Sequence, residues 1–314
     1  MISLNVLDST RILGFGYPRA ARAIEAGLRR GLDPAGDPSR VAIRVGEHAR
    51  LLYMPSLAGG GLGVKLVTVS ADNPAAGLPM IHGIYVLFDP ITFAPVRLLD
   101  GTALTTLRTP AVSVVAVRKA LQRVNHPLRV VIFGIGPQGV GHLDAFHAVA
   151  IEDGDFPRVE SATFVTRRDP TPLLPSRPSP EVTGLARDDP TLPEVLASAD
   201  LVICASTASR PLFDSSVLGD ETVVVAIGAS TPEASEVDAA WCARSTVIVE
   251  DRATAVRESG EVVAALQAGA ITERDLVDLS AVVTGAHDLP SGPILFTGGG
   301  MAWQDLLVAQ AIVD

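Results

Sequence analysis

The stretch RVVIFGIGPQGVGHLDAF at residues 129–146 decides the fold of the larger part of this chain. Its order predicts a short apolar strand, a turn with glycines in the spacing G-x-G-x-x-G, and a helix. The first glycine permits a tight turn, the second lets a pyrophosphate approach the backbone, and the third lets the helix pack on the strand. An ordinary tight turn between a strand and a helix is the alternative. The residues that we predict to bind dinucleotide phosphates are Gly134, Gly136, Pro137, Gln138 and Gly139.

Apolar strands alternate with helices around this turn. A helix is predicted over residues 106–122, with Pro110 in its opening turns. Strands that are apolar throughout are buried on both faces, and right-handed crossovers between them give a doubly wound parallel sheet. We therefore predict a Rossmann-type α/β domain over residues 111–292. Residues 169–193 contain seven prolines and are predicted as a loop or an irregular helix. The later predicted strands lie at residues 200–206, 222–228 and 245–250.

The residues before this domain follow a different pattern. An amphipathic helix is predicted over residues 19–30, and five strands follow one another with Gly- and Pro-containing turns between them. Strands that follow strands indicate a meandering or mixed sheet, so we predict a strand-rich α+β domain over residues 1–110. The end of the chain, within residues 293–314, returns to helical periodicity. The five predicted strands lie at residues 41–46, 51–55, 63–69, 81–88 and 94–99.

The composition excludes several classes of protein. Apolar residues make up 47% of the 314 residues and charged residues 19%, which excludes a disordered chain. The formal net charge of −10 argues against a nucleic-acid partner, and no apolar run is long enough to cross a membrane. Two cysteines exclude a disulfide framework and suit a reducing compartment. We expect a soluble, cytoplasmic protein that binds neither nucleic acid nor membranes.

The sequence predicts no metal site and no hydrolase site. His82, His142 and His147 lack the spacing of metal ligands. Neither a G-x-S-x-G motif nor a catalytic Cys–His arrangement occurs. His142 and Asp144 follow the glycine-rich turn and are expected on the surface of their helix.

The end of the strand after the glycine-rich turn selects the nucleotide. An acidic residue there binds the ribose hydroxyls of NAD(H), whereas an arginine accommodates the 2′-phosphate of NADP(H). This chain has Thr166, Arg167 and Arg168 at that point, and Asp169 only afterwards. We therefore predict NADP(H) as the preferred cofactor, with NAD(H) as a second candidate, because guanidinium groups match phosphate oxygens. Two solvated loop arginines are the alternative.

Three cationic side chains are candidates for substrate binding. Of the 25 basic residues only Lys65 and Lys119 are lysine. Lys65 lies inside an apolar predicted strand, which indicates an ammonium group that holds a carboxylate or passes a proton. A lysine at a solvent-exposed strand edge is the alternative. Arg108 lies where the two domains join and is expected to face the cleft between them, and Arg40 is a third candidate. Three cations at one site favour a small carboxylate as the substrate.

These features resemble the ornithine cyclodeaminase/mu-crystallin family over nearly the whole chain. The run DGTALTTLRT at residues 100–109 and the pattern GVKLV at 63–67 are its most specific parts. The resemblance implies a strand-rich domain for substrate binding and dimerisation, a Rossmann domain, and a C-terminal helix that returns to the first domain. It also implies a homodimer formed through the first domain's sheet. Further matching segments are MPS at 54–56, GLP at 77–79, GIGPQG at 134–139, AIGASTPEASEVD at 226–238, ESGEV at 258–262 and GMAWQD at 300–305.

The resemblance also implies roles for individual residues. Lys65, Arg108 and Arg40 match the residues that bind the substrate carboxylate. Thr109 resembles a threonine that contacts the nucleotide beside Arg108. Thr166 and Arg167 resemble an Asn-Arg pair of the NADPH-binding members. The remaining cofactor contacts that the resemblance implies are Ser206, Thr207, Ile227 and Gly228.

The chain departs from the ornithine cyclodeaminases themselves at four positions. Ser230 replaces a catalytic aspartate, and Leu52 replaces an acidic residue that contacts the distal amine of the substrate. Ala234 and Gly298 replace a lysine and a serine. A lyase that accepts a proton and holds an ammonium needs carboxylates at the first two positions, because serine and leucine have no comparable basicity.

Three functions follow from these residues, in decreasing order of preference. The first is an NAD(P)H-dependent reductase of a small cyclic imino acid, or an amino-acid dehydrogenase in the reverse direction. In it Lys65 gives the proton to nitrogen, and Ser230 hydrogen-bonds the substrate or a water. The second is ornithine cyclodeaminase, which converts ornithine to proline and ammonia with tightly held NAD. The third is a protein that binds NADPH and a small acid without catalysis.

Overall fold

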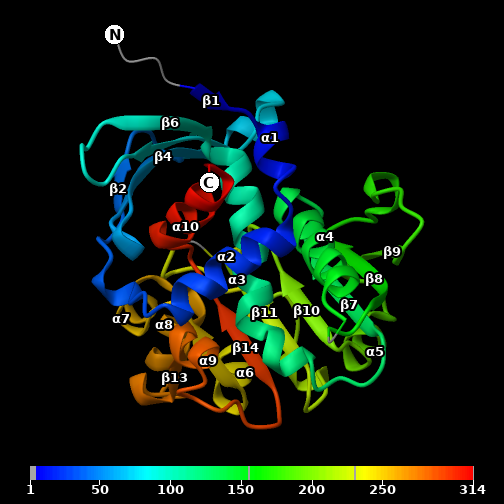
Figure 1. Cartoon of the computed structure of the whole chain (residues 1–314). Helices are drawn as coiled ribbons and strands as arrows, with labels where there is room; N and C mark the ends of the chain where they lie inside the picture. The colour runs from blue at the N-terminus through cyan, green and yellow to red at the C-terminus, as the bar shows by residue number, and fades with distance from the viewer. Residues whose placement is uncertain (1–4, 155, 230, 314) are drawn as a thin grey trace. The chain divides into compact units, whose positions relative to one another are not determined.

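The computed structural model describes residues 5–154, 156–229 and 231–313. The chain divides into two compact units, of which the first is Met1–Val112 with Met301–Asp314 and the second is Ser113–Gly300. In the described part of the chain, each unit contains one sheet (Figure 1). None of the described helices is long and apolar enough to span a membrane.

The second unit has eight described strands in a parallel sheet, in the order β13-β12-β14-β11-β10-β7-β8-β9. The strand order reverses between β7 and β10, as it does in a doubly wound Rossmann sheet. The predicted fold is therefore confirmed. The strands are β7 (Leu128–Phe133), β8 (Val159–Thr166), β9 (Glu181–Ala186), β10 (Leu201–Cys204), β11 (Val223–Ala226), β12 (Thr246–Val249), β13 (Leu276–Asp278) and β14 (Ile294–Thr297).

Both faces of this sheet are buried. Alternate strand residues such as Val131 and Phe133 pack in one cluster with Trp241 and Val262, from helices on that face. The intervening residues, such as Ile132, are buried as well, and α4 (Pro137–Glu152) contacts β8 and β10. This double burial explains why the strands are apolar throughout. The other helices are α5 (Leu192–Ala197), α6 (Ala239–Arg244), α7 (Arg252–Glu258), α8 (Gly260–Gln267) and α9 (Leu279–Thr284).

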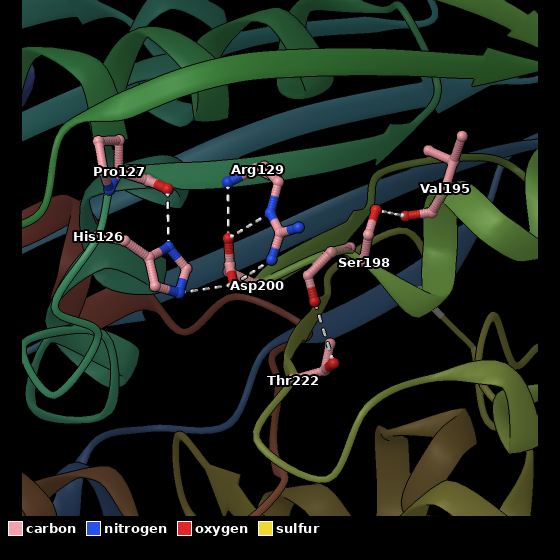
Figure 2. A network of polar contacts seen from close by, with 8 residues as sticks. His126, Pro127, Arg129, Val195, Ser198, Asp200 and Thr222 are labelled. Carbon is pink, nitrogen blue, oxygen red and sulfur yellow. Dashed lines mark hydrogen bonds and ion pairs between the residues drawn. The ribbon is translucent and has the colours of Figure 1, made fainter.

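Polar side chains tie the strands together where they begin. Asp200 accepts a hydrogen bond from the backbone N–H of Arg129 at 2.8 Å, and its Oδ1 lies 3.7 Å from Nε2 of His126 (Figure 2). Thr222 donates from Oγ1 to the carbonyl oxygen of Ala199 at 3.1 Å. These contacts join the amino ends of β7, β10 and β11. Ligands of such sheets bind at the opposite edge, outside the carboxyl ends of the strands.

The proline-rich stretch at residues 169–193 contains β9, so the prediction of a loop or an irregular helix is wrong for six residues. The segment between Pro180 and Pro190 is free of proline, and its backbone N–H groups are therefore available to a ladder. It pairs with β8 at the edge of the sheet.

The first unit has six described strands in the order β1-β6-β5-β4-β3-β2, antiparallel except for the pair β1 and β6. The predicted strands are confirmed. Helix α10 contacts β3, β4, β5 and α2 (Figure 1). The elements are β1 (Asn5–Leu7), α1 (Ser9–Leu13), α2 (Tyr17–Arg29), β2 (Val41–Arg44), β3 (Ala49–Ser56), β4 (Leu62–Ser70), β5 (Ile81–Phe88), β6 (Pro95–Asp100) and α10 (Ala302–Val313).

Two boundaries differ from the sequence pattern. Helix α3 (Gly101–Leu121) begins earlier than predicted because Asp100 accepts hydrogen bonds from the backbone of Thr102 and Ala103, at 2.9 and 3.0 Å. Pro110 consequently lies in the middle of this helix and not in its opening turns. Strand β14 pairs with β11 and β12, so the chain returns to the first unit at Met301 and not at residue 293.

Candidate active site

Lys65 lies on the buried face of the first unit's sheet. Strand alternation places it with Gly63 and Val67 on the face that α10 contacts. Its side chain is 2% exposed, and Nζ lies 2.7 Å from Oδ2 of Asp305. The same ammonium donates a hydrogen bond to Oγ1 of Thr105 at 3.2 Å. Lys65 is therefore not a lysine at a solvent-exposed strand edge.

Arg108 approaches the same carboxylate from α3. Its Nη1 donates to Oε1 of Gln304 at 2.8 Å, and its Nε lies 3.4 Å from Oδ1 of Asp305. Gln304 and Asp305 are consecutive residues in the first turn of α10, and both are fully buried. Helix α10 thus supplies one amide and one carboxylate that fix two of the predicted cations. Thr109, the next residue of α3, is also buried.

Arg40 belongs to the segment just before β2 and is half-buried. Asp37 holds this segment, because its Oδ1 accepts hydrogen bonds from Oγ of Ser56 at 3.0 Å and from the backbone N–H of Leu57 at 2.9 Å. The charge of Arg40 contributes to lowering the pKa of Lys65. The structure therefore brings the three predicted cations into one electrostatic group, which we call the cationic cluster: Arg40, Lys65 and Arg108.

Within the cationic cluster, Lys65 has a lower pKa than an ordinary lysine. Burial lowers the pKa of Lys65 to about 8, the carboxylate of Asp305 opposes this change, and the charges of Arg108 and Arg40 add to it. An ammonium group with a pKa near neutrality is suited to general acid catalysis. Lys65 and Arg108 share the carboxylate of Asp305, and Arg40 adds a further positive charge near Lys65. This excess of positive charge favours the binding of an anion.

Tyr85 explains the glycine of the GVKLV pattern. It pairs with Lys65 across β4 and β5 and is fully buried. A Cβ atom on Gly63 would lie 1.9 Å from the Tyr85 hydroxyl, so the tyrosine fits only beside glycine. Burial, and next the charges of Asp305 and Asp37, raise the pKa of Tyr85 well above its usual value. The hydroxyl therefore remains neutral beside the cationic cluster.

The glycine-rich turn of the second unit has the shape that a dinucleotide requires. Gly134 has a φ of +105°, and a Cβ atom there would lie 2.4 Å from the carbonyl oxygen of Ala205, after β10. A Cβ atom on Gly139 would lie 2.0 Å from the carbonyl oxygen of Gly134, whereas one on Gly136 would meet nothing within 4 Å. Gly136 thus borders open space at the start of α4, a helix end without a side-chain cap. These residues fit a bound pyrophosphate.

His142 is buried, so its expected surface position is wrong. Its Nδ1 lies 2.7 Å from the carbonyl oxygen of Gln138, and its Nε2 lies 2.9 Å from Oγ of Ser113. Because a carbonyl only accepts, Nδ1 carries the proton and Nε2 accepts from the serine. Burial lowers the pKa of His142 to about 4, which keeps the ring neutral. His142 thereby fixes the first turn of α4, which Pro137 and Gln138 begin, to α3.

The predicted nucleotide-selecting residues lie where β8 ends. Thr166 is the last residue of this strand, and Arg167 and Arg168 follow it with exposed side chains. Oγ1 of Thr166 donates a hydrogen bond to the carbonyl oxygen of Arg168, which shapes the turn. Strand β8 is the parallel neighbour of β7, so this turn and the glycine-rich turn lie at one edge of the sheet.

The predicted contacts after β10 and β11 lie at the same edge. Ser206 and Thr207 follow β10, and Ile227 and Gly228 follow its parallel neighbour β11. The predicted residue Ser230 lies outside the described residues.

The sequence analysis did not single out three buried carboxylates, which are Asp305 and the pair Glu236 and Glu261. Asp305 carries a charge within the apolar segment that forms α10, and a buried charge requires a partner. That lone charge was the available signal. Glu236 is fully buried and accepts hydrogen bonds from Ser206 and Gly228, and its own N–H donates to Glu261. Nothing local in the sequence indicates which loops it joins. Among the described residues, no group of three metal-ligating side chains is present.

The sequence profile of the ornithine cyclodeaminase/mu-crystallin family matches residues 13–162 and 182–314 of this chain. The chain belongs to this family. The match leaves out residues 163–181, which comprise the end of β8, the turn with Arg167 and Arg168, and the proline-rich residues up to the first residue of β9.

Several family members resemble the chain over most of its length. The Δ1-pyrroline-2-carboxylate/Δ1-piperideine-2-carboxylate reductase of Azospirillum brasilense is 28% identical over 278 residues, which cover 88% of this chain and 84% of the relative. A Δ1-pyrroline-2-carboxylate reductase of Bacillus cereus is 30% identical over 276 residues, which cover 85% and 82%. The structure of the Thermococcus litoralis Δ1-pyrroline-2-carboxylate reductase with NADH and L-proline superposes with a TM-score of 0.84 at 24% identity, covering 98% of this chain and 96% of that one.

Leu52, one of the four positions at which the chain departs from the ornithine cyclodeaminases, lies on the same face of the sheet as Lys65. Leu52 of β3 pairs with Val67 of β4, and Met54 pairs with Lys65. Since Leu52 and Met54 are two residues apart on a strand, they lie on the same face. The position that the resemblance assigns to a distal-amine contact is therefore apolar in this family member.

Proposed function

We propose that this protein is an NAD(P)H-dependent reductase of a small cyclic imino acid, such as Δ1-pyrroline-2-carboxylate or Δ1-piperideine-2-carboxylate. The observation that carries the proposal is the buried group of Lys65, Arg108 and Asp305, with Nζ of Lys65 2.7 Å from the carboxylate. Relatives with 28% and 30% identity that carry this activity in their names support it.

The cationic cluster accounts for the substrate end of the reaction. Arg108 and Arg40 bind the substrate carboxylate, since guanidinium groups match its two oxygens. Lys65 gives its proton to the imine nitrogen, and its pKa of about 8 suits this transfer near neutral pH. Asp305 holds Lys65 and Arg108 in place before substrate binds. The carbon–nitrogen double bond gains one hydride at carbon and one proton at nitrogen, and a cyclic amino acid results.

A nicotinamide dinucleotide fits the second unit. When bound, the reduced nicotinamide supplies the hydride. Gly134, Gly136 and Gly139 leave room for its pyrophosphate at the start of α4. Arg167 and Arg168, exposed after β8, pair with the 2′-phosphate of NADP(H), which makes NADP(H) the preferred cofactor and NAD(H) the weaker one.

The reductase explains the residues better than the cyclodeaminase does. Ornithine has a second ammonium group, and binding it requires an acidic partner. Leu52 supplies none on the Lys65 face. A cyclic imino acid has no such group, so an apolar side chain suits its ring.

We also propose a homodimer formed through the outer face of the first unit's sheet. Val41, Tyr53, Leu66 and Ile84 are paired across β2, β3, β4 and β5, and form one continuous row. Their exposed fractions of 49%, 43%, 37% and 40% are high for large apolar residues. A contiguous apolar patch of this kind is typical of an interface, and a second copy offers a matching surface. Leu66→Glu is expected to shift the protein to a monomer in size-exclusion chromatography with light scattering, and an unchanged mass would refute this interface.

A cytoplasmic location is part of the same proposal. Cys204 and Cys242 are free and buried thiols, which suits a reducing compartment.

One pair of assays tests the proposed function. Purified protein is mixed with NADPH and Δ1-pyrroline-2-carboxylate or Δ1-piperideine-2-carboxylate, and in parallel with NAD⁺ and ornithine. We expect loss of the absorbance of reduced nicotinamide in the first mixture and no ammonia in the second. Ammonia from ornithine would support the cyclodeaminase. No reaction in either mixture, with NADPH still bound, would support a binding protein.

A further inference from the structure

A single carboxylate connects the two loops that follow β10 and β11. Oε1 of Glu236 accepts hydrogen bonds from the backbone N–H and the hydroxyl of Ser206, at 2.8 and 2.6 Å. Its Oε2 accepts one from the backbone N–H of Gly228 at 2.7 Å. All three donors point to one side chain, so the spacing of the loops depends on its length and on its ability to accept.

The loops are shaped around this carboxylate. A Cβ atom on Gly228 would lie 2.6 Å from each carboxylate oxygen of Glu236 and 2.2 Å from the carbonyl oxygen of Ser206. The close approach therefore requires glycine at position 228. The Ser206 hydroxyl also accepts a hydrogen bond from the backbone N–H of Ala208 at 3.1 Å, which extends the effect further along the loop.

Glu236 is held in place from a third strand. Its backbone N–H donates to Oε1 of Glu261 at 2.9 Å, and Oε2 of Glu261 accepts from Oγ1 of Thr297 at 3.1 Å. Thr297 is the last residue of β14, the neighbour of β11. The carboxyl ends of β10, β11 and β14 are thus joined through two buried glutamates.

These two carboxylates have no cationic partner within the described parts of the chain, and backbone and hydroxyl groups are the donors that hold them. Burying a charge without a cation is unfavourable, and apolar replacements of buried charges are often more stable. A fold that required only stability would therefore gain nothing from Glu236. Its hydrogen bonds go to the two loops where the sequence predicts the cofactor contacts Ser206 and Gly228.

We infer that Glu236 is a positioning residue of the cofactor site, which sets the spacing of the loops after β10 and β11 and so prepares their backbone for a nicotinamide dinucleotide. The inference rests on the proposed function, because it assumes that this edge of the sheet binds the dinucleotide. Glu236 acts through Ser206 and Gly228 and not by contact with the substrate.

The test replaces one acceptor oxygen by a donor. In Glu236→Gln the amide nitrogen faces a backbone N–H, so at least one of the three hydrogen bonds is lost. Asp238→Asn is the matched control, since Asp238 accepts from the backbone N–H and hydroxyl of Ser215, at 3.0 and 2.6 Å, and from the backbone N–H of Trp241 at 2.9 Å. The donor set is the same, but it connects the turn at Ser215 to the start of α6.

We expect Glu236→Gln to raise the Kd for NADPH, titrated without substrate, by about tenfold or more, a loss of about 1.4 kcal/mol. The Asp238→Asn control is expected to stay within about twofold of wild type. Hydrogen exchange at the amides of Ser206 and Gly228 is expected to accelerate in the first variant alone. In steady-state kinetics the KM for NADPH rises, whereas the KM for the imino acid does not. Glu236→Asp, one methylene shorter, is expected to weaken NADPH in the same direction and serves if the amide variant fails to fold.

The possible outcomes distinguish a failure of the proposed function from a failure of this inference alone. A wild-type protein that binds neither NADPH nor NADH refutes the proposed function and the inference together. Wild-type binding with an unchanged Kd in Glu236→Gln overturns the inference alone. Equal weakening in Glu236→Gln and Asp238→Asn also overturns it, because a general loss of stability then explains both.

Discussion

Asparagine at position 305 tests how the cationic cluster works. Asp305→Asn keeps the shape of the side chain and removes the charge 2.7 Å from Nζ of Lys65 and 3.4 Å from Nε of Arg108. At that shorter distance, with an effective dielectric constant of about 20, two unit charges attract by roughly 6 kcal/mol. Asparagine still offers a hydrogen-bond acceptor, so we expect a loss of about half of this, or about 3 kcal/mol. Such a loss lowers the pKa of Lys65 by about two pH units, since one unit corresponds to about 1.4 kcal/mol.

The change has a distinct signature in the pH dependence of imino-acid reduction. With a pKa of about 8, roughly 90% of Lys65 is protonated at about pH 7 in the wild type. With a pKa of about 6, roughly 10% is protonated in the variant, so kcat at about pH 7 falls roughly tenfold and recovers below about pH 6. The assay is kcat between about pH 5 and pH 9, per active site titrated with NADPH.

The control removes a carboxylate from the other unit. Asp200→Asn loses the contacts with Arg129 and His126 at the amino edge of the sheet (Figure 2) and is expected to keep the wild-type pH profile. Removing Asp305 breaks a buried ion pair, which costs about 3–5 kcal/mol of stability, so unfolding is recorded for both variants. A kcat that falls equally at every pH, or a midpoint that stays near pH 8, would refute Lys65 as the proton donor.

Three further outcomes are expected. Lys65→Ala should lower kcat by about 10²–10⁴-fold and leave the Kd for NADPH nearly unchanged, and a variant as active as wild type would remove the lysine from the mechanism. Arg167→Ala should raise the Kd for NADPH by about tenfold and leave that for NADH nearly unchanged, whereas equal weakening of both would contradict a 2′-phosphate contact. Burial raises the pKa of Glu236 from 4.5 to about 7, so between these values the native state binds a proton that the unfolded state has lost. The free energy of unfolding is therefore highest below about pH 4.5 and falls as the pH rises through about 7. Urea denaturation should therefore show wild type losing about 3 kcal/mol more than Glu236→Gln across that interval, and parallel curves would refute it.

The dinucleotide-binding unit was predictable because its signals are local. The apolar strands, the glycine spacing and the helix after it each occupy a few consecutive residues, and the parallel sheet follows from their alternation. Strand β9 was missed because its six residues are surrounded by prolines and pair at the edge of the sheet. His142 was misplaced because its polar partners come from Ser113 and Gln138, and no spacing rule indicates that pair.

The candidate site was predictable in part, for the same reason. Lys65 stood out as a charge in an apolar strand, and Arg108 by its place where the two predicted domains join. The resemblance supported both and strengthened the case for Arg40. Asp305, the partner of Lys65 and Arg108, is 240 residues away from Lys65 along the chain, and the return of α10 to the first unit decides the contact. Glu236 likewise joins loops that only the order of β10 and β11 places side by side. Such contacts are set by topology, which one sequence does not display.

The stoichiometry of NADPH oxidation with Δ1-pyrroline-2-carboxylate tests the assignment as an imino-acid reductase most directly. Purified protein is incubated with both compounds, and the NADPH consumed and the proline formed are measured in the same samples. We predict that each proline formed accompanies the oxidation of one NADPH. Proline that appears only from ornithine, with ammonia and without net consumption of nucleotide, would contradict the assignment.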